Sequence, residues 1–368
     1  MPTPSVLISG AGIAGSTLAY WLGRYGISAT VVERATDLRS SGNPVDVREE
    51  AVAVATEMQV MPRLRELATQ VTSMIFVDAD NERIGTTGMG QSEYDVEISR
   101  RDLASTLADA AKDKAEFIYG DFIEEMVQGD DGVEVVFAGG QHRRFDMVVG
   151  ADGTHSSVRR LCFGPEGRFI RHLGMFVGTV PLDGPLPDPH EVIMYNVAGR
   201  AVSLHPGGGE PVAAFIFRRR RPKDFDHRDV AQHRRLLTHA YRNVGWQVPR
   251  LLELVRRSDE FYFDAVSQVR LPRWSSGRVT LVGDASSSVS LFGDGSTLAI
   301  IGAKALADAI AAHPEDHAAA FQAYEDAHRP RVTAKHRNVA HSSRILIPGS
   351  HVGVAARNLA LRTLFRNG

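Results

Sequence analysis

Apolar and polar positions follow two different periods over the first 33 residues. Residues 5–9 form a short apolar run and residues 29–33 a run rich in β-branched residues, as two buried strands do. Between them, apolar positions recur at helical spacing up to Gly26, namely Ala14, Leu18, Leu22 and Tyr25. This strand, helix, strand order predicts the opening of a parallel, doubly wound sheet.

Two further helices have start signals in the sequence. Asp46 with Glu49 resembles a capping box, and Ser99 with Asp102 repeats that arrangement before another apolar stripe. We therefore expect helices to begin at both places, within the same lobe as the first sheet.

Three β-rich runs follow between residues 122 and 149. They are separated by the hairpin signals of residues 130–132 and 139–140, which read Asp-Asp-Gly and Gly-Gly. These runs predict an antiparallel extension beside the parallel sheet.

From about residue 173 to residue 263 the pattern changes to strands separated by proline and glycine turns, with a helical region over residues 234–257. Residues 278–283 then return to a buried strand, and residues 296–312 to an Ala-rich helix. The chain is expected to leave the first lobe, build a second one and return.

The composition is that of an ordinary globular protein. The 368 residues are 43% hydrophobic and 23% charged, with a formal net charge of -2. A balance this close to neutral lacks the basic excess typical of nucleic-acid binding, so a small-molecule substrate is expected. No apolar run reaches the length of a membrane span, and the single cysteine, Cys162, fits a reducing compartment. We expect a cytoplasmic protein that binds neither nucleic acid nor membrane.

A glycine-rich segment connects the first predicted strand to the first predicted helix. Residues 10–15 read Gly-Ala-Gly-Ile-Ala-Gly, the GxGxxG pattern that lets a dinucleotide pyrophosphate approach a helix N-terminus. Glu33 lies 18 residues beyond Gly15, where a carboxylate accepts hydrogen bonds from ribose hydroxyls. Because Glu33 repels a 2′-phosphate, the site is expected to hold FAD or NAD rather than NADP.

Two later motifs make this expectation more specific. Residues 150–159 read Gly-Ala-Asp-Gly-Thr-His-Ser-Ser-Val-Arg, and residues 283–285 read Gly-Asp-Ala after an apolar run. These segments resemble the GADGxxSxVR and GDA motifs of the class A flavoprotein monooxygenases, the group of para-hydroxybenzoate hydroxylase and the tetracycline-inactivating monooxygenases. Residues 97–103 and 324–330 also resemble segments of that group, so the likeness covers nearly the whole chain except residues 173–263.

The resemblance implies FAD contacts from both ends of the chain. The glycines of residues 10–15 are expected at the pyrophosphate, Glu33 at the adenosine ribose and Arg100 at the phosphate region. Asp284 is expected at the ribityl or pyrophosphate oxygens, with Asp152 mainly in support. The full expected cofactor-binding set is Gly10, Gly12, Ala14, Gly15, Glu33, Arg34, Arg48, Arg100, Asp152, Asp284, Gly293, Gly295, Ser296 and Thr297.

Physical chemistry also favours a flavin at the last of these positions. Backbone amides at the start of the helix at Ser296 are expected to face the flavin pyrimidine, where negative charge develops on reduction. In the same loop, Asp294 is expected either to oppose that charge or to cap the helix.

Together, the elements and the motifs predict an α/β fold with a Rossmann-like FAD-binding lobe, a β-sheet substrate-binding lobe and a C-terminal helical tail. The expected parts are residues 1–172 for the first part of the FAD-binding lobe, with possible substrate-lobe strands near 72–95, residues 173–265 for the substrate-binding lobe, residues 266–330 for the second part of the FAD-binding lobe, and residues 331–368 for the tail.

The resemblance also implies a reaction. NAD(P)H is expected to reduce FAD, O₂ to add at the flavin C4a position, and the resulting hydroperoxide to hydroxylate an aromatic or polycyclic organic substrate. The sequence has no second dinucleotide motif, which fits a group whose nicotinamide cofactor binds transiently. Two alternatives stay open: an FAD-dependent reductase or dehydrogenase without productive oxygen chemistry, and a flavin-binding protein that has lost catalysis.

The substrate side is less well defined. No catalytic residue is assigned, because His172, His190 and His205 are equally unsupported as a base. The histidines show no metal-binding spacing, so no metal site is expected. An apolar ceiling over the substrate is expected from residues of the second lobe, namely Met175, Phe176, Met194, Tyr195, Phe215 and Phe217.

Two local features remain: a flavin loop that departs from the pattern of the resembled family, and a run of arginines. Ser287 occupies the position of the usual histidine of the flavin loop, and Leu291 that of a proline, which puts full activity in doubt. Residues 218–221 are four consecutive arginines. They are expected to form a solvated loop, with the phosphates of a passing nicotinamide cofactor as the alternative partner.

Overall fold

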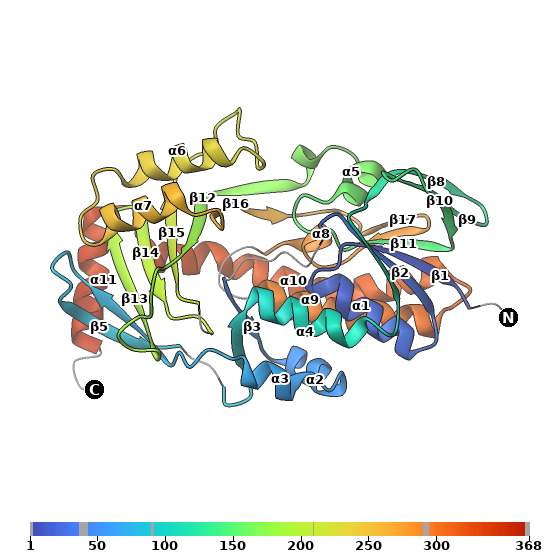
Figure 1. Ribbon diagram of the computed structural model, residues 1–368, viewed down its shortest axis with the longest axis horizontal. Helices are drawn as coiled ribbons and strands as arrows, with labels where there is room; N and C mark the ends of the chain where they lie inside the picture. Colours follow the sequence, from blue (N-terminus) through green and yellow to red (C-terminus); the bar gives the residue numbers. More distant parts are fainter. Residues whose placement is uncertain (1–2, 37–42, 90–91, 209, 290–293, 365–368) are drawn as a thin grey trace.

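The computed structural model describes residues 3–36, 43–89, 92–208, 210–289 and 294–364, with the backbone alone for residues 338–344 and 364. Figure 1 shows two lobes side by side. The lobe on the right contains the beginning of the chain and part of its last third, and the lobe on the left contains a large sheet. This mixed architecture of helices and sheets confirms the predicted fold class.

In the described part of the chain, six strands form the sheet of the first lobe, in the order β17-β18-β11-β1-β2-β7. Every neighbouring pair is parallel except β17 with β18. The central strands are buried on both faces, which is why they read as continuous apolar runs. The strands are β1 (Ser5–Ser9), β2 (Ser28–Glu33), β7 (Glu116–Tyr119), β11 (Met147–Gly150), β17 (Ser275–Ser276) and β18 (Val279–Leu281).

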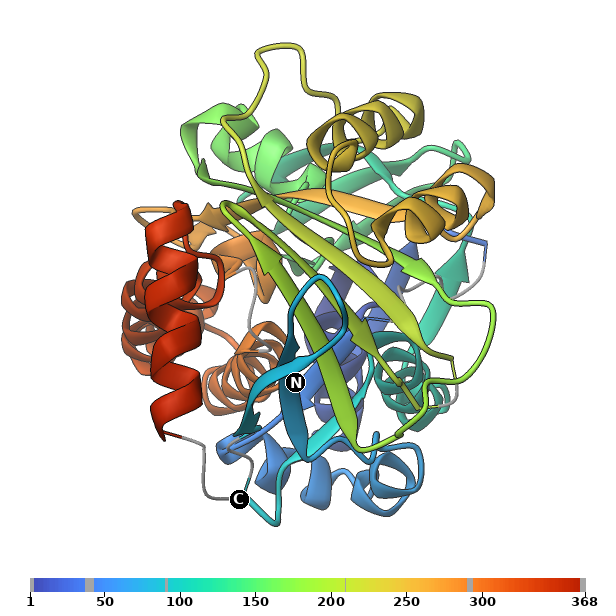
Figure 2. The ribbon, with the colours of Figure 1, turned by 90° about the vertical axis from the view of Figure 1, so that its left-hand side faces the viewer.

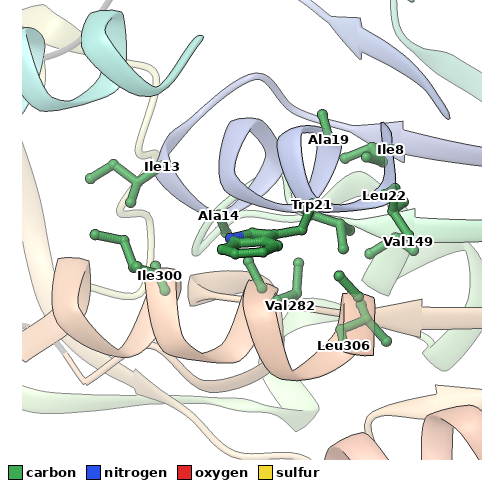
Figure 3. Packing of buried hydrophobic residues seen from close by; sticks show 14 of the residues in the cluster. Ile8, Ile13, Ala14, Ala19, Trp21, Leu22, Val149, Val282, Ile300 and Leu306 are labelled. Carbon is green, nitrogen blue, oxygen red and sulfur yellow. The ribbon is translucent and has the colours of Figure 1, made fainter. Parts of the chain in front are cut away.

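Two helices distant in the sequence pack together on this sheet. Helix α1 (Ile13–Arg24) lies against α9 (Asp294–Ala312). In Figure 3, Trp21 of α1 lies among apolar side chains from β11, α9 and the segment after β18, and it is 2% exposed. The glycine loop before α1 and the start of α9 are therefore held in one rigid core.

Helix α9 also meets the length and hydropathy expected of a membrane-crossing segment, and it is the one helix of the described residues to do so. Of its most apolar window, 67% is buried inside the protein. Its apolar character is thus accounted for by the core between the sheet and α1.

A smaller antiparallel sheet lies beside the first one. Among the described strands its order is β10-β9-β8. The two hairpins fall at the predicted turns, so the predicted antiparallel extension is confirmed. The elements here are β8 (Ile123–Gly129), β9 (Gly132–Phe137), β10 (His142–Phe145) and the neighbouring helix α5 (Ser157–Phe163).

Seven strands of the described residues form the sheet of the second lobe, in the order β16-β12-β15-β14-β13-β4-β5. The two strands from residues 73–88 join it through a parallel pairing of β4 with β13, and every other neighbouring pair is antiparallel. The strands are β4 (Ser73–Val77), β5 (Arg83–Gly88), β12 (Ile170–Pro181), β13 (Glu191–Val197), β14 (Arg200–His205), β15 (Val212–Arg218) and β16 (Tyr262–Val269).

The two faces of this second sheet have different partners. Helices α6 (Val230–Tyr241) and α7 (Val248–Arg257) cover one face, as Figures 1 and 2 show. The other face contacts the first lobe, for example through Asp264 and His155, and the C-terminal segment, through Asn196 and Leu346.

The expected apolar ceiling is divided between these two faces. Met175 and Met194 belong to the cluster on the face of the C-terminal segment. Successive residues of a strand point to opposite faces. The other four expected members are therefore wrong as a ceiling, because they pack under α6 and α7, namely Phe176, Tyr195, Phe215 and Phe217.

A two-stranded antiparallel ribbon and three helices complete the first lobe. The predicted helix start at Ser99 is confirmed, since its Oγ accepts the N–H of Asp102 at 3.0 Å. These elements are β3 (Pro44–Val47), β6 (Val96–Ser99), α2 (Glu50–Glu57), α3 (Met61–Glu66) and α4 (Arg100–Ala111).

The other predicted helix exists as α2, but its predicted start at Asp46 is wrong. Asp46 is a buried residue of β3, and α2 begins only after Glu49, which has a φ of 54° and makes no side-chain cap. The pairing of β3 with β6 decides the local structure, because Val45 and Val47 on either side of Asp46 suit a strand.

The C-terminal part is helical, as expected. Helix α10 (His317–Leu346) runs from the core of the first lobe to that of the second, and α11 (His351–Leu364) packs against β5. The expected boundaries at residues 265 and 331 fall inside β16 and α10, because both elements contribute to both cores. The division into domains stays a prediction.

Candidate cofactor-binding site

The three glycines between β1 and α1 have different reasons to be glycine. Gly10 has a φ of +105°, and a Cβ there would lie 2.7 Å from the carbonyl oxygen of Ala151. A Cβ at Gly15 would lie 1.9 Å from the carbonyl oxygen of Gly10. At Gly12 a Cβ would meet nothing within 4 Å. The fold therefore requires the first and third glycines, whereas Gly12 leaves open space at the N-terminus of α1, where a pyrophosphate fits.

Glu33 stands at the end of β2, next to the glycine loop. Its Oε2 accepts the N–H of Ala11, and its Oε1 accepts the N–H of Ala35, each at 2.9 Å. The carboxylate thus fixes the loop. The lone pairs that these two bonds leave are free to accept hydrogen bonds from the ribose hydroxyls that we expect there.

Arg34 and Asp152 meet at the start of α5. The exposed Arg34 guanidinium lies 3.8 Å from the centroid of the Phe122 ring, and it donates to Ser157 Oγ at 3.3 Å. Asp152 Oδ2 accepts the N–H groups of Ser157 and Val158 at 2.7 and 3.1 Å. Asp152 therefore anchors the N-terminus of α5, which begins inside the second motif, and its supporting role at the cofactor stays a prediction.

Arg48 and Asp46 form an ion pair whose atoms are 2.9 Å apart. Burial raises the pKa of Asp46 to about 6, and the charge of Arg48 opposes this rise. Ser296 Oγ and Thr297 Oγ1 donate to the carbonyl oxygen of Asp46 at 2.6 and 3.0 Å, and Thr297 Oγ1 accepts the N–H of Arg48 at 3.1 Å. Both hydroxyls thus hold β3 against α9, and it is the backbone amides of these residues that we expect at the flavin.

Asp284 begins the short helix α8 (Asp284–Ser287), directly after Gly283 with its φ of +63°. A Cβ at Gly283 would lie 2.8 Å from that of Ala14, so this turn rests on the first turn of α1. Burial raises the pKa of Asp284, and the charge of Arg100 opposes the rise. The fold thus brings Arg100 and Asp284, from opposite ends of the chain, within electrostatic reach beside the glycine loop.

The loop before α9 is described only in part. Gly293 and Leu291 lie outside the described residues. Gly295 is in the first turn of α9, where a Cβ would lie 3.9 Å from Asp284 Oδ1. Ser287, at the usual histidine position, is buried in α8.

Asp294, the first residue of α9, is paired with a cation. Its Oδ1 lies 2.8 Å from Nζ of Lys335 in α10, and Nζ also lies 3.0 Å from Oε1 of Glu49. Burial lowers the pKa of Lys335, but the two carboxylates outweigh burial and raise it overall. Lys335 is therefore charged at neutral pH and offsets part of the field of Asp294.

Replacing Asp294 by Asn is expected to raise the midpoint potential of bound FAD. At a separation of about 10 Å and an effective dielectric constant of about 20, one charge contributes about 1.7 kcal/mol, or about 35 mV for a two-electron couple. A redox titration of the FAD-loaded protein measures the shift, and Lys335→Met should move the potential in the opposite direction. An unchanged potential with lowered thermal stability in Asp294→Asn would show that the pair only supports the helix.

Four ionisable side chains that the sequence did not single out meet between the lobes. His155, inside the second motif, lies 2.9 Å from Glu166 Oε2 and 3.6 Å from Asp264 Oδ1. His227, from the loop before α6, stacks on the His155 ring with centroids 3.9 Å apart. Burial lowers the pKa of His155, but the two carboxylates outweigh it and raise the pKa to about 9. The histidine in the motif was visible in the sequence, but Asp264 and His227 come from distant segments, and no local pattern links Glu166 to it.

The three histidines considered as bases are all engaged elsewhere. Each lies against a carbonyl or carboxylate oxygen of another element, namely His172 against Arg219 O at 3.0 Å, His190 against Gln70 O at 2.8 Å and His205 against Glu97 Oε1 at 3.0 Å. These contacts single out none of them, so the catalytic residue stays unassigned. Among the described residues, no three His, Cys, Asp or Glu side chains are grouped to hold a metal ion.

Comparison with protein families identifies the cofactor. The sequence profile of a family described as an FAD binding domain matches residues 3–339. The chain belongs to this FAD-binding family. The open space at Gly12 and the residues around it fit the dinucleotide that the family binds.

Similar proteins show which branch of FAD-binding proteins this is. A flavin-dependent monooxygenase from an unknown prokaryotic organism is 34% identical over 339 residues, 90% of this chain and 87% of that protein. An uncharacterized protein of Mycobacterium tuberculosis is 37% identical over 330 residues, 87% of this chain and 88% of its own. The crystal structure of tetracycline destructase Tet(51) matches with a TM-score of 0.85 and 30% identity, covering 99% of this chain and 97% of that one. The predictions of a class A flavoprotein monooxygenase and of an FAD-dependent oxidoreductase are confirmed.

Proposed function

We propose that this flavoprotein uses NAD(P)H and O₂ to hydroxylate an aromatic or polycyclic organic substrate. The observation that carries the proposal is the open space at Gly12, at the start of α1, where the turn of Gly283 rests on Ala14 and the same core includes α9. When bound there, FAD supplies the transfer of electrons from NAD(P)H and the activation of O₂.

Residues of this chain would bind and orient the cofactor. Gly10, Gly12 and Gly15 would hold the pyrophosphate, and Glu33 the adenosine ribose. The amides at the start of α9 would stabilise negative charge on the ring, because the N-terminus of a helix carries partial positive charge. Asp284 and Arg100 would hold the ribityl and pyrophosphate groups that join the two halves of FAD.

The second lobe would supply the substrate's surroundings. Its sheet face toward the C-terminal segment contains an apolar cluster in which Met175, Met194 and Ile216 pack against Ile347 and Leu361. This buried cluster would support the wall of the substrate space and help to keep water out of it. Tetracycline destructase acts, by its name, on a polycyclic compound, which supports a polycyclic substrate here.

The function is tested by mixing the FAD-loaded protein with NADH or NADPH, first without oxygen and then with it, across a panel of aromatic and polycyclic compounds. We expect loss of the oxidised flavin spectrum without oxygen. With oxygen and a true substrate, we expect a product heavier by one oxygen atom. Steady turnover with another electron acceptor and no oxygenated product would support the reductase alternative instead.

A further inference from the structure

We propose that the second lobe carries a separate binding site for a small phosphorylated molecule, on the sheet face covered by α6 and α7. A cavity of about 250 Å³ lies there. It opens between the ends of β14 and β15 and the C-terminal end of α6, and its lining includes Arg200, Phe217, Arg218, Arg219, His239 and Arg242.

The cavity lies on the opposite face of the sheet from the contacts with the first lobe. Arg200 is the cross-strand partner of Phe217, and cross-strand partners share a face. Phe217 packs in the core under α6 and α7. Asp264 and His155 join the lobes on the other face. The sheet therefore separates this cavity from the candidate flavin site, and the proposal does not depend on the proposed reaction.

The lining is strongly cationic and contains no carboxylate. The guanidinium groups of Arg200, Arg219 and Arg242 form no hydrogen bond or ion pair with any residue that the structure describes. Arg218 Nε donates to the carbonyl oxygen of Ile347 at 2.8 Å. Such a cluster is notable in a chain of net charge -2, because like charges gathered around one cavity repel unless an anion lies between them.

A purely structural explanation covers only part of this cluster. His239 and Arg242 lie at the C-terminal end of α6, where positive side chains are favourable without any ligand. Arg200 and Arg219 come from strand ends instead. One arginine at the helix end and two at strand ends, with His239 beside them, surround one space and indicate an anion site rather than a helix cap.

The geometry of arginine favours phosphate over carboxylate. Each guanidinium presents a planar fork of N–H donors, and a phosphate monoester has three free oxygens to meet them where a carboxylate has two. A second cavity of about 440 Å³ shares Arg219 and His239 with the first. Its other lining residues are Pro222, Asp224, Gln232, Arg235 and Leu236, so it pairs one carboxylate with one further arginine beside apolar and amide groups. This space would take the organic part of the ligand, so we infer a phosphoester of a small organic molecule.

The four-arginine run contributes only in part to this site. Arg218 and Arg219 both border the cavity. Arg218 is the cross-strand partner of Met175 and turns its Nε to Ile347 on the other face of the sheet, and Arg221 lies over the ring of Phe225, so Arg219 is the member of the run that we assign to the anion. The phosphate has two possible sources, a free phosphoester or the phosphate groups of a nicotinamide dinucleotide. Their shared chemistry is that of anionic phosphate oxygens.

Isothermal titration of the FAD-loaded protein with pyrophosphate tests the site, because bound FAD blocks the other pyrophosphate-binding position. We expect one saturable site in the wild type and at least tenfold weaker binding in the double variant Arg219→Gln/Arg242→Gln. The matched control Arg65→Gln/Arg250→Gln removes two exposed charges that line neither cavity, and it should bind like the wild type. An unchanged flavin spectrum shows that both variants are folded.

Competition then identifies the source of the phosphate. Displacement of pyrophosphate by NADP⁺ but not NAD⁺ would assign the site to a 2′-phosphate, displacement by both to a dinucleotide diphosphate, and displacement by neither to a free phosphoester. No saturable binding in the wild type, or an equal loss in the control variant, would overturn the proposal. Because no turnover is measured, such a failure leaves the proposed reaction untouched.

Discussion

Gly12→Val is expected to abolish FAD binding and leave the fold intact. A Cβ at Gly12 meets nothing within 4 Å, so the protein itself accommodates a side chain there. The branched side chain would occupy the space that a pyrophosphate needs at the N-terminus of α1. We expect FAD affinity to fall at least about a hundredfold, or about 2.8 kcal/mol, measured by quenching of flavin fluorescence on titration with the apoprotein.

Two other glycines make the result specific. A Cβ at Gly184 also meets nothing within 4 Å, so Gly184→Val should bind FAD normally. Gly15→Ala should fail to fold properly instead, because its Cβ would overlap the carbonyl oxygen of Gly10. Normal FAD binding by a folded Gly12→Val would show that the cofactor lies elsewhere.

His155→Gln is expected to weaken the junction between the lobes in a pH-dependent way. The pKa of His155 rises from 6.5 to about 9 in the folded protein. A histidine whose pKa is higher in the folded than in the unfolded state stabilises the fold fully at a pH below its unfolded pKa of 6.5. This stabilisation is lost as the pH rises through the folded pKa of about 9. This shift in the pKa corresponds to a contribution on the order of 3 kcal/mol to the free energy of unfolding.

Chemical denaturation at about pH 6 and about pH 9.5 measures the difference in the free energy of unfolding between the wild type and His155→Gln. This difference should be large at the lower pH and small at the higher one. His227 is the matched control, because burial and the charge of His155 lower its pKa. A lowered histidine pKa costs stability as the pH falls below 6.5, so His227→Gln should show the opposite trend. An equal loss at both pH values in His155→Gln would show that its charge contributes nothing.

The elements that the sequence predicted correctly depend on neighbours in the chain. The first strand, helix and strand follow from local periodicity, and the helix start at Ser99 follows from a residue three positions later. The failure at Asp46 has the opposite cause. Its pattern fits a cap, but β6 and the hydroxyls of Ser296 and Thr297 hold it in a strand.

The site could be predicted in outline because its motifs are also patterns of neighbouring residues. The motifs indicated which residues would gather, but the different roles of Gly10 and Gly12 depend on Ala151, which no local pattern shows. The pairing of Asp294 with Lys335 is likewise a contact across 41 residues. The alternation of side chains along a strand did contain the signal that Met175 and Phe176 face opposite ways, and it would have divided the apolar ceiling correctly.

The central claim, that this protein is a monooxygenase acting on an organic molecule, is tested most directly with isotopically heavy dioxygen in ordinary water. For a substrate that accelerates NAD(P)H consumption, we expect one heavy oxygen atom in each product molecule and one NAD(P)H consumed for each oxygen atom transferred. Oxygen derived from water, or complete recovery of the reducing equivalents as hydrogen peroxide with every compound that accelerates NAD(P)H consumption, would contradict it.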